Sequence, residues 1–251
     1  MQHFTLRIQR YDPEKETVFF EEHNVPWTED FTVLDALNHI KDKTGASLAY
    51  RWACRMGICG SCGAIVNGKP ILMCSTFCRD LKQPIRIRPL ANFPVIKDLV
   101  VDTDDAMNKF REAMPYTKIQ KQHIAPTEET LQTPAQLRKL KYASQCIKCM
   151  LCYSACPVYG LNKDFVGPAA GAVAERYNKD SRDEIKDKRM DSMTGDNGVY
   201  KCSYIGECSQ VCPKSVDPAA ALQKLKVAGI FHTAKSIAKS ASAAISSKRK
   251  S

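Results

Sequence analysis

Two cysteine-rich runs constrain this chain more than any other feature of its sequence. In the first, residues 146–157 read CIKCMLCYSACP, so its cysteines are separated by two, two and three residues and the last precedes a proline. This spacing is typical of iron–sulfur sites in which three thiolates of a run hold one cluster and the fourth reaches another. It therefore predicts a second run elsewhere in the chain.

The second run is present but lacks one thiol. Residues 202–213 read CSYIGECSQVCP, and Ile205 stands where the template has its second cysteine. The crossed arrangement then leaves four ligands for one cluster and three for the other, because isoleucine offers no donor atom. The sequence predicts a [4Fe–4S] cluster on one set and a [3Fe–4S] cluster on the other: Cys146, Cys149, Cys152 and Cys212 for the first, and Cys156, Cys202 and Cys208 for the second.

A third group of cysteines lies near the N-terminus. Its members follow one another with gaps of four and then two residues, and the last comes after an Asn-Gly pair: Cys54, Cys59, Cys62 and Cys74. This is the plant-type [2Fe–2S] spacing, and the glycines between the cysteines would let the backbone approach a cluster. Structural zinc is the alternative, since zinc sites also pair cysteines. The remaining cysteine, Cys78, is interpreted as a small buried apolar side chain.

Composition narrows the class of protein. Twelve cysteines would suit a secreted disulfide scaffold, but no charged stretch followed by an apolar one opens the chain, so we expect reduced thiols in the cytoplasm. Lys224, Lys226 and Lys235 interrupt the most apolar C-terminal stretch, and we expect no membrane span. The net charge is +10, yet the basic residues are scattered, which argues against nucleic-acid binding.

The N-terminal part has the pattern of a small α+β domain. Apolar and polar residues alternate over residues 4–8, which together with residues 18–20 predicts a β-hairpin. Thr32 resembles a helix cap, and Gly45 resembles a stop after apolar residues at helical spacing. Two short strands flank Asn67-Gly68, a strong hairpin signal, and residues 85–88 alternate again. The prediction is a β-grasp domain over residues 1–97.

The second part has helical patterning and little strand character, from about Val95 onward. Helices are predicted at residues 102–109, 133–143, 169–177 and 219–235, with a loop containing Ala125-Pro126-Thr127. This gives an all-α domain over residues 98–235. Residues 236–251 are rich in Ser, Ala and Lys and are expected to form a basic, frayed tail.

Several longer stretches resemble the iron–sulfur subunit of the succinate dehydrogenase and fumarate reductase family. They include RWACRMGICGSCG, LANFPVIKDLVVD, FVGPAA, RYNKDSRD and CSYIGECSQVCPKSVDPAAA, and the likeness runs from about residue 4 to residue 231. The resemblance implies a plant-type ferredoxin domain followed by an α-helical ferredoxin domain. It also implies a flavoprotein partner that holds FAD and the dicarboxylate site, so that no catalytic residue is expected on this chain. Integral membrane anchor subunits with a quinone site would hold it at the cytoplasmic face of the membrane.

Departures within this resemblance favour the fumarate reductase branch. Gly160 and Ser203 stand near positions where some succinate dehydrogenases have Trp and His beside the quinone, and Cys62 stands where some have Asp. By this resemblance, Lys226 matches a lysine near the quinol, which the fumarate reductase branch implies to be menaquinol. A solvated helix lysine is the alternative interpretation. Succinate oxidation, or service to another flavin dehydrogenase, is the rival function. Within the RYNKDSRD stretch, Arg182 and Asp183 are interpreted as residues of helix packing.

Overall fold

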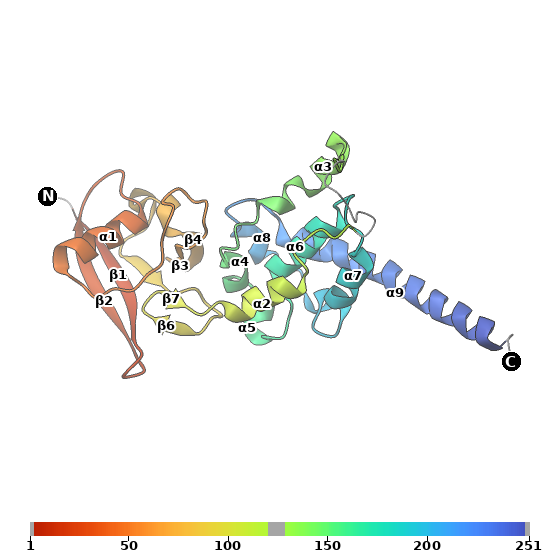
Figure 1. Ribbon diagram of the computed structural model, residues 1–251. Helices are drawn as coiled ribbons and strands as arrows, with labels where there is room; N and C mark the ends of the chain where they lie inside the picture. The colour runs from red at the N-terminus through yellow and green to blue at the C-terminus, as the bar shows by residue number, and fades with distance from the viewer. Residues whose placement is uncertain (1–2, 120–128, 249–251) are drawn as a thin grey trace.

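The protein divides into a sheet-containing N-terminal part and a helical C-terminal part that lie side by side (Figure 1). The structure is a computed structural model and describes residues 3–119 and 129–248. The predicted order of an α+β region followed by an all-α region is confirmed. The predicted loop at residues 125–127 lies outside the described residues.

A five-stranded sheet forms the N-terminal part, in the strand order β2-β1-β5-β3-β4. β1 pairs with β5 in parallel, and all other neighbours are antiparallel. The strands are β1 (His3–Asp12), β2 (Thr17–Pro26), β3 (Gly63–Val66), β4 (Lys69–Leu72) and β5 (Ile85–Arg88). Every strand expected from the sequence in this region is therefore present, including the hairpin across Asn67 and Gly68.

One helix, α1 (Val33–Thr44), supplies its apolar residues to the core beside the sheet. Thr32 caps it through a reciprocal pair of hydrogen bonds with Asp35, and Gly45 ends it in the left-handed conformation at φ 64°. In β1, Phe4, Leu6 and Ile8 are fully buried while their neighbours are partly exposed. The period-two pattern of the sequence thus decides which face of the strand joins the core.

A short hairpin, β6 (Val95–Lys97) and β7 (Val100–Val101), corrects the expectation of helix from Val95 onward. Its turn residue Asp98 accepts hydrogen bonds from Arg10 Nε at 2.8 Å and from the backbone N–H of Ala49 at 2.8 Å. Strands this short carry too few residues for a recognisable alternation, and tertiary contacts hold them. The hairpin spans residues 97 and 98, and the domain boundary predicted there stays a prediction.

The C-terminal part is built from helices, several of them only one turn long. The four predicted helices begin within two residues of their expected starts; α3, for example, follows the Thr133 cap with Pro134 at its first position. The helices are α2 (Asp104–Glu112), α3 (Pro134–Lys141), α4 (Leu151–Ser154), α5 (Pro157–Leu161), α6 (Pro168–Asn178), α7 (Lys186–Thr194), α8 (Glu207–Gln210) and α9 (Pro218–Lys248). Helix α7 was not predicted from the sequence. Single 3₁₀ turns occur in both parts of the molecule: η1 (Met73–Ser75) and η2 (Cys78–Asp80) in the N-terminal part, and η3 (Ala143–Gln145) and η4 (Val199–Lys201) in the C-terminal part.

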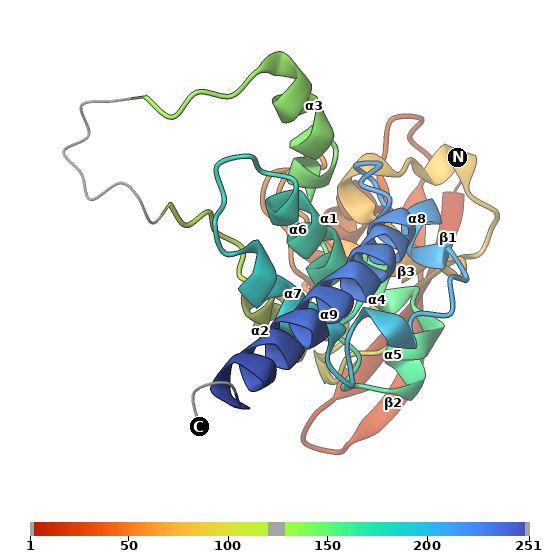
Figure 2. The ribbon, with the colours of Figure 1, turned by 90° about the vertical axis from the view of Figure 1, so that its right-hand side faces the viewer.

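Helix α9 is longer than the sequence led us to expect. The predicted frayed tail from residue 236 is wrong for the described residues, because the helix continues to Lys248 and projects beyond the rest of the helical part (Figures 1 and 2). After Gly229 the sequence contains no glycine or proline, and Ala and Lys are strong helix formers. Among the described residues, no helix is both long and apolar enough to span a membrane.

Candidate iron–sulfur centres

The structure brings the eleven candidate cysteines together in the three groups predicted from their spacing. In the first group, Cys54 interacts with Cys59, and Cys62 interacts with both Cys59 and Cys74. In the second, Cys152 interacts with each of its three predicted companions, Cys146, Cys149 and Cys212, and also with Cys208 of the third group. In the third, Cys208 interacts with Cys156 and Cys202. All the cysteines are free thiols.

Backbone N–H groups surround the first group of thiols. The Cys54 Sγ accepts hydrogen bonds from the N–H groups of Met56 at 3.5 Å, Ile58 at 3.3 Å and Cys59 at 3.3 Å. These bonds lower the pKa of Cys54 to about 6, because N–H donors favour the thiolate form. Thiolates are the ligands that iron–sulfur clusters require, and N–H donors to sulfur are one of the ways in which proteins adjust cluster potentials. The donor chemistry of this loop fits a cluster.

The two later runs share one backbone conformation. Lys148 and Tyr204, each two residues after the first cysteine of its run, both have left-handed φ values, 55° and 59°. Met150 and Gly206, two residues further on, are also left-handed, at 63° and 88°. Such conformations are strained for residues other than glycine and cluster at functional sites. Each loop then enters a one-turn helix, α4 or α8.

This correspondence places Ile205 at the backbone position that Cys149 occupies in the first run. The two side chains have different surroundings. Cys149 is half-buried, and burial raises the pKa of its thiol to about 11. Ile205 is 55% exposed and belongs to the lining of a pocket. The second loop therefore keeps the ligand-holding conformation where the ligand itself is absent.

Each of the two later groups lines a pocket of its own. One pocket is lined by the cysteines of the second group, and another is lined by the cysteines of the third. Their other walls are mainly apolar, with Ala169 and Val216 in the former and Phe165 and Leu222 in the latter. In the part of the chain that the structure describes, no three or more His, Cys, Asp or Glu side chains are arranged to hold a metal ion. Pockets of thiols with apolar walls fit buried multi-iron cofactors.

The loop of the first group lies directly against the loop of the second. A Cβ at Gly60 would lie 2.9 Å from the Cα and Cβ of Cys149 and 2.9 Å from the carbonyl oxygen of Ile147. Gly60 also has φ 78°, so glycine is required there both for its conformation and for the close approach. A shared pocket, bordered by Arg51 and Lys148 among others, lies beside this contact. The first and second groups of thiols are therefore neighbours.

Asn92 links the two parts of the molecule and was not singled out from the sequence. Its Nδ2 lies 2.9, 3.0 and 3.1 Å from the carbonyl oxygens of Tyr153, Ser154 and Cys156. These carbonyls belong to the first cysteine run, so a side chain of the N-terminal part holds the backbone around one of its cysteines. A Cβ at Gly160 would lie 2.8 Å from Asn92 Oδ1, which accounts for glycine at that position. The one sequence signal for Asn92 was its place in the LANFP stretch.

Lys226 lies beside the third group. It extends from α9, and its Nζ donates a hydrogen bond to the carbonyl oxygen of Cys202 at 2.5 Å. Gln223, one turn earlier in α9, places its Nε2 3.8 Å from the Cys202 Sγ.

Cys78 belongs to none of the three groups. It is 2% exposed, and burial raises the pKa of its thiol to about 12. Its interpretation as a buried apolar side chain is confirmed by this burial.

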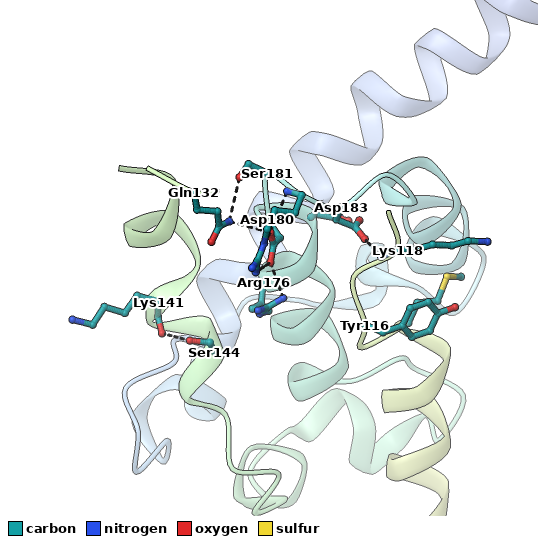
Figure 3. Close-up of polar contacts among 12 residues, drawn as sticks. Tyr116, Lys118, Gln132, Lys141, Ser144, Arg176, Asp180, Ser181 and Asp183 are labelled. Carbon is teal, nitrogen blue, oxygen red and sulfur yellow. Dashed lines mark hydrogen bonds and ion pairs between the residues drawn. The ribbon is translucent and has the colours of Figure 1, made fainter. Parts of the chain in front are cut away.

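The RYNKDSRD stretch ties segments of the helical part together. Figure 3 shows the Asp180 carboxylate between Arg176 and Gln132, and Arg182 Nη2 donates to it at 2.8 Å. The hydrogen bond from Arg182 lowers the pKa of Asp180. Nearby, Asp183 and Arg189 form a buried ion pair at 2.7 Å. These contacts agree with the packing role expected for this stretch.

Known protein families match both parts of the chain. A family described as a 2Fe-2S iron-sulfur cluster binding domain matches residues 5–108, and one described as a 4Fe-4S dicluster domain matches residues 142–216. The fumarate reductase iron-sulfur subunit of Mycobacterium tuberculosis is 46% identical over 239 residues, covering 94% of this chain and 97% of the relative. The succinate dehydrogenase iron-sulfur subunit of Coxiella burnetii is 35% identical, covering 88% and 95%.

A solved structure, the Mycobacterium smegmatis Sdh1 complex in the apo form, contains a chain of similar fold. The TM-score is 0.82 at 26% identity, and the match covers 90% of this chain and 95% of the other. The likeness in sequence and fold extends over both the sheet and the helical part, and so over all three groups of thiols. The chain belongs to the family of iron–sulfur subunits of the fumarate reductase and succinate dehydrogenase complexes.

Proposed function

We propose that this chain is the electron-transfer subunit of a membrane-associated quinol:fumarate reductase. The observation that carries the proposal is the succession of three groups of thiols through the molecule, with the loops of the first and second in contact at Gly60 and Cys149. Iron–sulfur clusters supply one-electron storage when bound. The protein residues provide the thiolate ligands, aim N–H groups at sulfur and exclude water with apolar walls.

The proposed ligand sets follow the observed groups. A [2Fe–2S] cluster would take Cys54, Cys59, Cys62 and Cys74, and a [4Fe–4S] cluster would take Cys146, Cys149, Cys152 and Cys212. A [3Fe–4S] cluster would take Cys156, Cys202 and Cys208. The last assignment rests on the isoleucine at position 205 in a loop with the same left-handed residues as its cysteine-containing counterpart.

The proposed partners lie at opposite ends of the electron path. A flavoprotein subunit with FAD would carry the dicarboxylate site beside the N-terminal domain, proposed as residues 1–97. Integral membrane anchor subunits would hold the helical domain, proposed as residues 98–235, at the cytoplasmic face of the membrane. Lys226 would hydrogen-bond a quinone oxygen, with menaquinone as the proposed quinone, since its ammonium group already lies beside Cys202.

The direction of the reaction is proposed from the relatives. Identity to a subunit named for fumarate reductase is 46%, against 35% to one named for succinate dehydrogenase. Succinate oxidation is the second candidate, and the likeness of the fold to a chain of the Sdh1 complex favours it.

The test is purification of the complete complex from native membranes, with identification of its subunits and quinone. We expect a flavoprotein, anchor subunits and EPR signals from three kinds of cluster. Fumarate reduction by menaquinol should be faster than succinate oxidation. A colourless preparation containing zinc would refute the proposal, and slower fumarate reduction than succinate oxidation would reverse the proposed direction.

A further inference from the structure

The pockets of the second and third groups differ in the charges at their rims. Among the described residues, the charged side chains lining the pocket of the second group are Lys148 and Lys214, with no acidic side chain. The pocket of the third group has Glu207 as the charged residue in its lining, and Lys226 approaches from behind Cys202. The third pocket thus has one negative and one positive side chain beside it, whereas the second has two positive side chains and no negative one.

Within residues 3–119 and 129–248, no carboxylate forms an ion pair with Lys148 or Lys214. The Lys148 Nζ lies 5.0 Å from the centre of the Phe110 ring, and Phe110 is only 4% exposed. A cation–π contact with a buried ring restricts where the ammonium group can move. Its charge is therefore held in place beside the cysteine loop.

Lys148 also borders the pocket between the first and second groups of thiols. It thus lies where the loop containing Gly60 meets the loop containing Cys149. A positive charge stabilises an added electron, and does so more strongly where apolar walls reduce screening by water. Net charge near a cluster is among the main determinants of its reduction potential.

We propose that Lys148 and Lys214 raise the reduction potential of the cluster held by the second group of cysteines, and so make it a better electron acceptor from the third when electrons pass from quinol towards fumarate. This inference rests on the proposed function, because it requires the clusters. It assigns a role in setting potential to two side chains that are not themselves ligands.

The experiment is a potentiometric titration of the intact complex, followed by EPR, for the wild type and for Lys148→Gln, Lys214→Gln and the double variant. We expect the midpoint potential of the [4Fe–4S] cluster to fall in each single variant and further in the double variant, with the other two clusters almost unchanged. A tenfold loss in the equilibrium constant for one-electron reduction corresponds to about 59 mV. Lys148→Arg should keep the wild-type potential, and added salt should shrink the differences.

Lys141→Gln is the matched control, since Lys141 is exposed on α3 and lines neither pocket. An unchanged [4Fe–4S] midpoint in the double variant, with its EPR signal intact, would overturn the proposal. An equal shift in the Lys141 control would overturn it as well, because the effect would then come from net charge alone. Failure of the proposed function is distinguishable, because the wild-type complex would then lack the cluster signals altogether.

Discussion

The two cysteine loops of the helical part share one backbone conformation but differ in their surroundings. The loop at Cys149 is pressed against Gly60 of the N-terminal part, whereas the loop at Ile205 opens outward, with Tyr204 58% and Ile205 55% exposed. Paired left-handed residues give both loops the same path. The comparison teaches that the fold fixes the shape of each site, while one side chain and the neighbouring surface decide what the site holds and what it faces.

The largest effect is expected when the cysteine that distinguishes the two loops is removed. Cys149→Ile should abolish the [4Fe–4S] signal, because the second group would then have three thiols like the third. Iron content and reduced-state EPR of the purified complex measure this. Cys78→Ala is the control, since Cys78 belongs to no group, and persistence of an unaltered [4Fe–4S] signal in Cys149→Ile would contradict the ligand assignment.

The converse substitution supplies the missing thiol. Ile205→Cys should replace the oxidised-state EPR signal of the three-iron cluster with that of a cubane and add roughly one iron atom per chain. The backbone needs no rearrangement, since the loop already follows the path of its counterpart. Ile205→Val should leave the signal as it is. An unchanged oxidised-state signal in Ile205→Cys would count against the three-thiol assignment.

A smaller effect is expected where the first loop meets the N-terminal part. Gly60→Ala should destabilise the protein by about 3 kcal/mol, because it combines left-handed strain with overlap against Cys149. Gly57→Ala is the matched control: its φ is 66°, but a Cβ there would meet only Ser75, at 3.7 Å. Gly57→Ala should lower the free energy of unfolding by about 1 kcal/mol, because only backbone strain contributes there. Denaturant unfolding compares them, and equal losses would show that the contact with Cys149 contributes nothing.

The smallest expected effect concerns Asn92. Asn92→Ala removes the donor to three carbonyls in the first run and should cost about 1–3 kcal/mol. One of these carbonyls belongs to Cys156, a proposed ligand of the [3Fe–4S] cluster. The EPR signal of that cluster should therefore broaden more than that of the [2Fe–2S] cluster. Unfolding curves and EPR line widths measure these changes. An unaltered stability would mean that water replaces the amide.

Much of this architecture could be predicted because it is encoded locally. The spacing of cysteines, the Asn67-Gly68 turn and the Thr32 cap each act within a few residues of chain. The β6–β7 hairpin could not be foreseen, since Asp98 is held by Arg10 and Ala49 from distant segments. Gly60 and Asn92 were missed as contacts for the same reason: their partners lie in the other half of the sequence. The length of α9 departs from the predicted frayed tail because Ala and Lys favour helix even where the composition is polar and rich in Lys.

The crossed pairing of the two runs has a consequence for how the protein gains and loses its cofactors. On the proposed ligand sets, Cys212 closes back on the beginning of the first run, and Cys156 closes forward onto the second, so each cluster acts as a crosslink across a long stretch of chain. Crosslinks of this kind stabilise a fold by restricting its unfolded ensemble. Each of these two clusters would have ligands in both cysteine runs. Release of one cluster would therefore loosen segments that carry ligands of the other. Loss of iron from the helical part should therefore be cooperative, and the two clusters should enter and leave it together.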